Sequence, residues 1–184
     1  MVRRWEPMLE QVARERYPVL VARAMLMVPT RADAEDLVQE ALVSTFSSRA
    51  RFDSVGQAEQ YVRRAIVSRF VDRSRRRGTE RSAWASAGQT AVTTQPGPGE
   101  AGLSTELETA LARLSPRQRA CVVLRHLDDL SIRETASVLG LSEGAVKRYV
   151  SDGVAALNAL LGTTDAAERD GVVLVRTEEV RRDA

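Results

Sequence analysis

The chain has 184 residues, of which 43% are hydrophobic and 28% charged, and its formal net charge at pH 7 is +2. This profile is typical of a globular protein, and the aromatic content of 4% predicts aliphatic cores. One cysteine and one histidine exclude a disulfide framework and a Cys-rich metal site. No apolar run reaches the length of a membrane span and no apolar leader follows Met1, so we expect a cytoplasmic protein without membrane insertion.

Residues 1–78 predict a small helical domain. Apolar residues recur at helical spacing over residues 12–26, 37–46 and 61–71, and each segment is predicted to be one helix. Turn-forming sequences at Pro29 and at residues 52–56 separate the three.

Carboxylate and amide side chains crowd one face of the second predicted helix. Asp36 forms an i, i+3 pair with Gln39 and an i, i+4 pair with Glu40, beside the apolar stripe of the helix. No histidine accompanies them, because His126 lies far along the chain. A solvated or partner-binding face is therefore favoured over a metal site.

The basic residues are unevenly distributed. Residues 1–78 hold 15 arginines and 10 acidic residues, whereas residues 103–162 balance at seven each. The cations gather at the end of the first domain: Arg63, Arg64, Arg69, Arg73, Arg75, Arg76 and Arg77. Such a run indicates a polyanion-binding site, and a solvated helix face is the alternative.

Residues 79–102 are rich in Thr, Ser, Gly and Pro, and they predict a flexible linker. After it, Ser115 with Gln118 and Ser131 with Glu134 have the spacing of capping boxes that open two helices. The second of these helices ends before a glycine, as a helix-turn-helix requires. The expected fold is thus all-α: two small helical domains joined by a flexible linker, with residues 103–162 forming a helix-turn-helix domain.

The last helix of this domain has the pattern of a DNA-reading helix. Its apolar positions are Val146, Val150, Val154 and Leu157. Its outward positions, which can meet base edges and phosphates in a major groove, are Ser142, Glu143, Gly144, Lys147, Arg148 and Ser151. A helical domain used only for protein contacts is the alternative. Asp152 and Gly153 then follow where further phosphate contacts would be expected, so we expect weak binding by this helix alone.

Together, "DLVQE" at residues 36–40, the basic helix, the linker and "LSPRQRACVVLRHLDDLSIRETASVLGLSEGAVKRYV" resemble the extracytoplasmic-function class of bacterial RNA polymerase sigma factors. The resemblance covers about residues 6–162 and both domains in order. It implies a protein that binds core RNA polymerase and promoter DNA, without an enzymatic activity or a cofactor of its own.

The resemblance also implies a role for each surface. Asp36, Gln39 and Glu40 would dock on the largest polymerase subunit, and the C-terminal domain would sit on the second-largest. The residues implied at the −10 element are Arg49, Phe52, Tyr61, Arg64, Ser68, Arg69 and Arg73. Those implied at the −35 element are the six outward residues from Ser142 to Ser151. Whether an anti-sigma factor or the tail of residues 163–184 regulates the chain stays open.

Two other classes compete with this interpretation. A LuxR-type helix-turn-helix regulator shares the sequence style of the C-terminal domain, but the acidic face and the arginine-rich helix argue against it. A helical enzyme finds no support, since there is no Gly-rich phosphate loop, no metal-ligand spacing and no nucleophile paired with a base.

Overall fold

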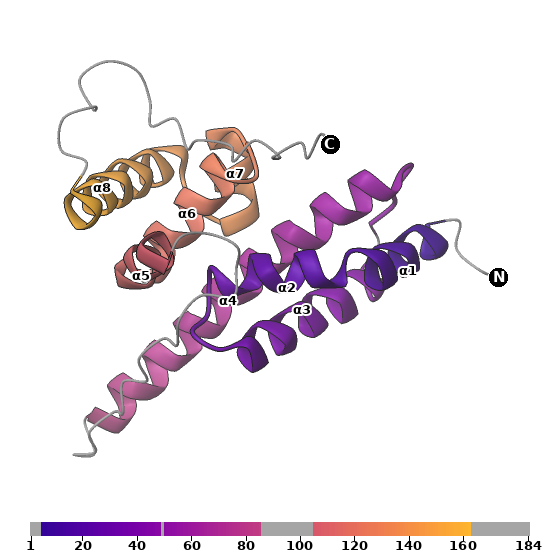
Figure 1. Ribbon diagram of the computed structural model, residues 1–184, viewed down its shortest axis with the longest axis horizontal. Helices are drawn as coiled ribbons and strands as arrows, with labels where there is room; N and C mark the ends of the chain where they lie inside the picture. Colours follow the sequence, from indigo (N-terminus) through magenta and orange to yellow (C-terminus); the bar gives the residue numbers. More distant parts are fainter. Residues whose placement is uncertain (1–4, 49, 86–104, 163–184) are drawn as a thin grey trace, which may run out of the picture.

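The computed structural model describes residues 5–48, 50–85 and 105–162, with only the backbone considered at 79–85 and 105. Every regular element in these ranges is an α-helix, which confirms the expected all-α class. The helices are α1 (Glu6–Glu15), α2 (Tyr17–Met25), α3 (Arg31–Phe46), α4 (Val55–Ala85), α5 (Thr105–Arg113), α6 (Pro116–His126), α7 (Ile132–Leu139) and α8 (Glu143–Leu161). We call α1–α4 the N-terminal module and α5–α8 the C-terminal module (Figure 1).

The prediction of a single helix over residues 12–26 is wrong. The chain forms α1 and α2, which meet at Arg16, whose backbone (φ −107°, ψ 0°) departs from the helical values. Pro18 lies in the first turn of α2. Proline lacks an N–H group and its ring would clash with the carbonyl four residues earlier, so it is tolerated in a first turn and breaks a continuous helix.

Helix α4 is the longest element and is longer than predicted. It runs to Ala85, so the first seven residues of the predicted linker are helical. Gly78 lies inside it, and a glycine inside a helix costs only about 1 kcal/mol relative to alanine. No proline occurs between Val55 and Pro96 to stop the helix. Figure 1 shows the C-terminal end of α4 extending beyond the bundle. The rest of the predicted linker and the tail lie outside the described residues.

The turns of the C-terminal module follow the sequence prediction closely. Both capping boxes are formed: Ser115 with Gln118 at the start of α6, and Ser131 with Glu134 at the start of α7. Gly140 ends α7 in the left-handed region at φ 62°, a conformation that costs glycine no steric strain. These caps set where α6 and α7 begin and where α7 ends.

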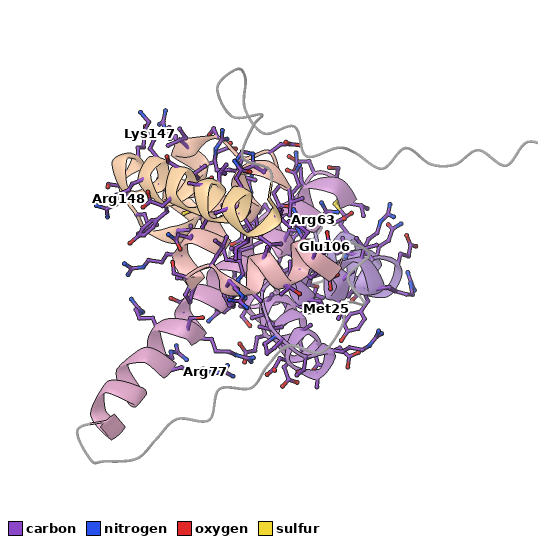
Figure 2. All side chains as sticks on the ribbon, turned by 60° about the vertical axis from the view of Figure 1, so that its left-hand side comes forward. Met25, Arg63, Arg77, Glu106, Lys147 and Arg148 are labelled. Atoms are coloured by element: carbon purple, nitrogen blue, oxygen red, sulfur yellow. The ribbon has the colours of Figure 1, made fainter. Side chains whose placement is uncertain are left out.

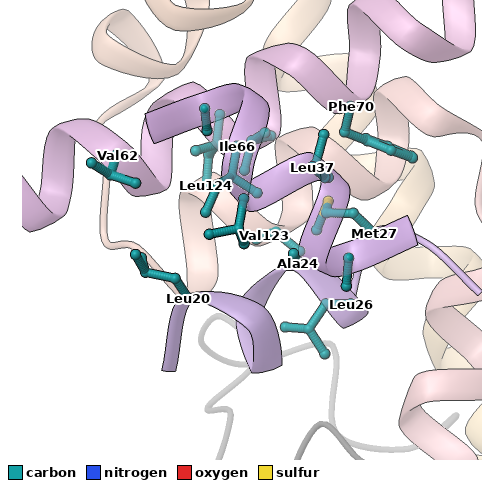
Figure 3. Close-up of a cluster of buried hydrophobic side chains, with 14 of the residues drawn as sticks. Leu20, Ala24, Leu26, Met27, Leu37, Val62, Ile66, Phe70, Val123 and Leu124 are labelled. Atoms are coloured by element: carbon teal, nitrogen blue, oxygen red, sulfur yellow. The ribbon is translucent and has the colours of Figure 1, made fainter. Parts of the chain in front are cut away.

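The two modules share one apolar cluster, which the sequence did not predict. Helix α4 packs against both α6 and α7. We call this contact between the modules the seam. Its apolar members include Leu20, Ala24, Ile66, Val123 and Leu124, all fully buried (Figure 3). Its charged members are Arg23, Arg63, Arg64, Arg119, Asp128 and Glu134.

Candidate nucleic-acid interface

The N-terminal half of α8 presents the residues predicted to read the −35 element. The Ser142 hydroxyl caps the helix by accepting a hydrogen bond from the Ala145 N–H at 3.2 Å. All six predicted residues, Ser142, Glu143, Gly144, Lys147, Arg148 and Ser151, are exposed. Figure 2 shows Lys147 and Arg148 projecting from the outer side of α8, away from the N-terminal module. The structure thus brings these six residues together on one open face.

Lys147 and Arg148 are the two cations of this face. Among the described residues, neither Lys147 nor Arg148 forms an ion pair, and the Arg148 guanidinium lies 5.5 Å from the centre of the Tyr149 ring. The Tyr149 hydroxyl accepts a hydrogen bond from Arg117 at 3.3 Å, which lowers the pKa of Tyr149. A helix N-terminus with unpaired cations on its outer side is suited to phosphates and base edges.

The inward stripe of α8 differs from the prediction at its centre. Val146 and Leu157 are buried as predicted, but Val150 and Val154 are only half-buried. Gly153 is buried instead, and a Cβ atom there would lie 2.8 Å from Val122 Cγ2 of α6. Gly153 therefore allows α8 to approach α6 closely, which explains a glycine that looked out of place in a DNA-reading helix.

Only part of the surface predicted to bind the −10 element is exposed to solvent. Tyr61 is 39% exposed on α4, but Phe52 is 6% exposed and packs edge-on between Tyr61 and Trp5, at centroid distances of 5.3 and 5.9 Å. In this conformation Phe52 is packed in the core, and its role at the −10 element stays a prediction. Apolar character suits both a core and a base-stacking site, so the sequence could not separate them. Arg49 lies outside the described residues.

Several cations of α4 are already paired within the protein. Arg64 lies 3.4 Å from the Glu134 carboxylate of α7, and Arg73 lies 2.7 Å from Glu40 of α3. Ser68 and Arg69 are half-buried, whereas Arg75, Arg76 and Arg77 are exposed. The C-terminal part of the basic helix is thus more open than the part nearer the seam.

The acidic face of α3 is exposed at Asp36 and Gln39, while Glu40 is held by Arg73. Sequence reasoning missed Val43, which is 65% exposed one turn further along the same face. Val43 is at i+4 from Gln39 and at i+3 from Glu40, and this helical spacing was the signal in the sequence that it shares their face. A polar face that ends in an exposed aliphatic side chain is suited to a protein partner.

Sequence reasoning also missed three buried charges. Arg23 pairs with Asp128, whose side chain is 5% exposed. Desolvation lowers the pKa of Arg23, an effect that the Asp128 charge opposes. Arg119, which directly precedes the apolar run of α6, has its pKa lowered to about 10 by burial. The apolar residues on both sides of Arg23 were the available signal in α2, whereas Arg119 follows Gln118 and had no such signal.

Metal and thiol chemistry have no site in the described ranges. No cluster of three His, Cys, Asp or Glu side chains occurs there. Cys121 is fully buried and burial raises its pKa to about 11, so it is a core thiol. No described helix has the length and hydropathy needed to cross a membrane.

Comparison with known proteins decides the family. The Sigma-70 region 2 family matches residues 1–80, and the Sigma-70 region 4 family matches residues 104–157. RNA polymerase sigma-E factor of Streptomyces avermitilis is 33% identical over 182 residues, covering 94% of this chain and 93% of that protein. The chain belongs to the extracytoplasmic-function class of RNA polymerase sigma factors. Region 2 corresponds to the N-terminal module and region 4 to the helix-turn-helix.

Other relatives agree with this sigma factor assignment. The ECF sigma factor SigM of Mycobacterium tuberculosis is 32% identical over 159 residues, covering 83% of this chain and 76% of that protein. The sigma factor RpoE of Bartonella quintana, solved in complex with the anti-sigma factor NepR, has the same fold, with a TM-score of 0.62 at 23% identity over 89% of this chain and 99% of that chain. The protein is therefore a sigma factor for transcription initiation and not an enzyme.

Proposed function

We propose that this sigma factor divides promoter recognition between its modules as follows. The exposed face of α8 reads the −35 element in duplex form, and α4 with Tyr61 captures and tracks the opened −10 strand. The face of α3 around Asp36 and Gln39 docks on the largest subunit of core RNA polymerase, and the C-terminal module docks on the second-largest. The protein would act in the cytoplasm, where core polymerase and promoters meet.

The observation that carries the proposal is the α8 face. It combines a capped helix N-terminus, two cations without intramolecular carboxylate partners in the described ranges, and small side chains that allow close approach. This combination is typical of a helix that enters a major groove. The arginines of α4 supply the charge for backbone contacts, and the ring of Tyr61 supplies a stacking surface for an unpaired base.

Reconstituted transcription tests this proposal. Core polymerase from the same bacterium, mixed with the full chain and genomic DNA fragments, should produce transcripts whose 5′ ends share two upstream sequence elements. Duplex binding without polymerase association would instead favour a regulator of the LuxR type. Core polymerase alone, with the same fragments, is the control.

Regulation is proposed to act between the modules. RpoE of Bartonella quintana was solved bound to an anti-sigma factor, and we propose a comparable protein partner for this chain. The alternative regulator is the tail of residues 163–184. Deleting the tail and measuring transcription with reconstituted holoenzyme separates the two: increased activity identifies the tail as an inhibitor, and unchanged activity favours a separate partner.

A further inference from the structure

Tyr149 lies beside the exposed face of α8 and is the only aromatic residue of that helix. Its ring is half-buried and packs against the cluster that Cys121, Ala136 and Val146 form between α6, α7 and α8. Its hydroxyl accepts a hydrogen bond from Arg117 of α6 at 3.3 Å. The ring is thus held in place by apolar packing along its body and by a hydrogen bond at its tip.

The guanidinium of Arg148 lies against this ring. Its central carbon is 5.5 Å from the centre of the Tyr149 ring, a distance at which a guanidinium is attracted to the face of an aromatic ring. Arg117, through its hydrogen bond, and then Arg148 lower the pKa of Tyr149, so both cations act on the same side chain. Within the described ranges Arg148 forms no ion pair that could draw its guanidinium elsewhere. Tyr149 is therefore the group that orients Arg148.

Lys147, the other cation of the same face, has no such support. It is exposed and, in the part of the chain that the structure describes, forms neither an ion pair nor a contact with an aromatic ring. A lysine ammonium is a point charge suited to a phosphate, whereas a planar guanidinium presents a fork of donors that matches two acceptors on one base edge. A fork that is already oriented loses less conformational entropy when it meets a base. The two cations are thus prepared for different ligands.

We propose that Tyr149 is a positioning residue for −35 recognition: its ring holds Arg148 in the orientation in which the guanidinium reads a base, while Lys147 contacts phosphate. This inference rests on the proposed reading of the −35 element by α8, and it adds which of the two cations selects the sequence. The base that an oriented guanidinium selects is one that offers two acceptors in the major groove, as guanine does through O6 and N7. Tyr149 itself touches no base in this arrangement.

Two substitutions at Tyr149 separate the ring from the hydroxyl. Tyr149→Leu removes the ring and keeps an apolar side chain against the core of the helix-turn-helix. Tyr149→Phe keeps the ring and removes only the hydroxyl. Circular dichroism shows whether each variant is folded, and Tyr149→Met, whose flexible side chain fills irregular gaps, replaces Tyr149→Leu if that variant is not. Lys147→Ala, on the same face of α8, is the matched control.

The discrimination of the −35 element is measured with reconstituted holoenzyme. It is titrated onto a fluorescent promoter duplex mapped by transcription, and onto the same duplex with single G·C pairs of the −35 element replaced in turn. Tyr149→Leu should lower the ratio of these affinities at one pair by about two- to fivefold, the value of a cation–π contact at an exposed site. Tyr149→Phe should retain the wild-type ratio. Lys147→Ala should weaken binding to every duplex alike and leave the ratio unchanged.

A double variant distinguishes positioning from a general structural role. In the Arg148→Ala background, Tyr149→Leu should lower the discrimination no further, because the ring acts through Arg148. An equal loss in both backgrounds, or an unchanged ratio in folded Tyr149→Leu, would overturn the positioning role while the −35 role of α8 stands. A wild type that binds all these duplexes equally would instead overturn the proposed −35 role itself, so the two failures are distinguishable.

Discussion

The two proposed DNA surfaces of this sigma factor differ in how they stand before DNA arrives. On α8, Lys147 and Arg148 project into solvent and form no ion pair within the described ranges. On α4, Arg64 is held by Glu134 and Arg73 by Glu40. A free cation can meet a phosphate at once, whereas a paired cation must first leave its carboxylate. If α8 reads the duplex and α4 captures the opened strand, as proposed, the two steps start from surfaces whose cations are unequally free to meet phosphates.

The largest expected effect comes from the apolar cluster that joins the two surfaces. Leu124→Ala should lower the free energy of unfolding by about 2–5 kcal/mol, because the fully buried side chain packs in a cluster shared by both modules. Denaturant unfolding followed by circular dichroism measures this. Leu160→Ala, at a side chain that is 45% exposed on α8, is the matched control and should cost under about 1 kcal/mol. Similar costs at both positions would show that the cluster is not a common core.

A substitution at Gly153 tests whether the close contact of α8 with α6 at this residue holds the −35 surface of α8 in its outward orientation. Gly153→Ala should destabilise the protein by about 1–3 kcal/mol, because the added methyl group would lie 2.8 Å from Val122 Cγ2. Gly144→Ala on the same helix meets no atom within 4 Å and should be neutral or stabilise by up to about 1 kcal/mol. Thermal unfolding of both variants gives the comparison. A neutral Gly153→Ala would contradict the close approach of α8 to α6.

Alanine substitutions at two arginines, one on α8 and one on α4, compare the two proposed DNA surfaces directly. Arg148→Ala should weaken discrimination of the −35 element by about 1–3 kcal/mol if its guanidinium contacts a base. Arg64→Ala should leave duplex binding by the free chain unchanged, since Arg64 is paired with Glu134. Fluorescence anisotropy with a duplex taken from a promoter mapped with the holoenzyme measures both. Equal losses would contradict the difference between the surfaces.

A charge reversal on the proposed docking face of α3 should have a smaller effect than the substitutions above. Asp36→Lys is expected to reduce affinity for core polymerase about tenfold, or roughly 1.4 kcal/mol, without affecting the fold. Glu10→Lys, also exposed but on α1, is the control and should have no effect. Glu40 is a poorer choice, because reversing its charge also releases Arg73. Unchanged affinity of Asp36→Lys in a competition assay at moderate salt would count against the docking role.

The features that the sequence predicted correctly are those that depend on residues close together in the chain. Ser115, Ser131, Ser142 and Gly140 fix helix starts and a helix end through short-range hydrogen bonds and backbone sterics, and all four hold in the structure. The outward face of α8 follows from helical periodicity in the same way. The break at Arg16 was missed because apolar periodicity outweighed the signal of Pro18.

The seam could not be predicted, because it depends on pairs far apart in the chain. Arg23 and Asp128 are separated by 105 residues, and Arg119 and Met27 by 92. Neither residue of such a pair carries a local signal of its partner. Phe52 shows the same limit: an apolar ring in a loop suits a base-stacking site or a core, and its contact with Trp5 joins two residues far apart in the chain.

The distance between the modules, measured on the wild-type chain with and without core polymerase, tests the central claim most directly. With fluorophores at Glu10→Cys and Ala155→Cys, the free chain should show the short distance of the closed seam. The same chain in a complex that initiates transcription should show a longer one if α4 holds the opened strand, as proposed. An unchanged distance in an active complex would contradict the account.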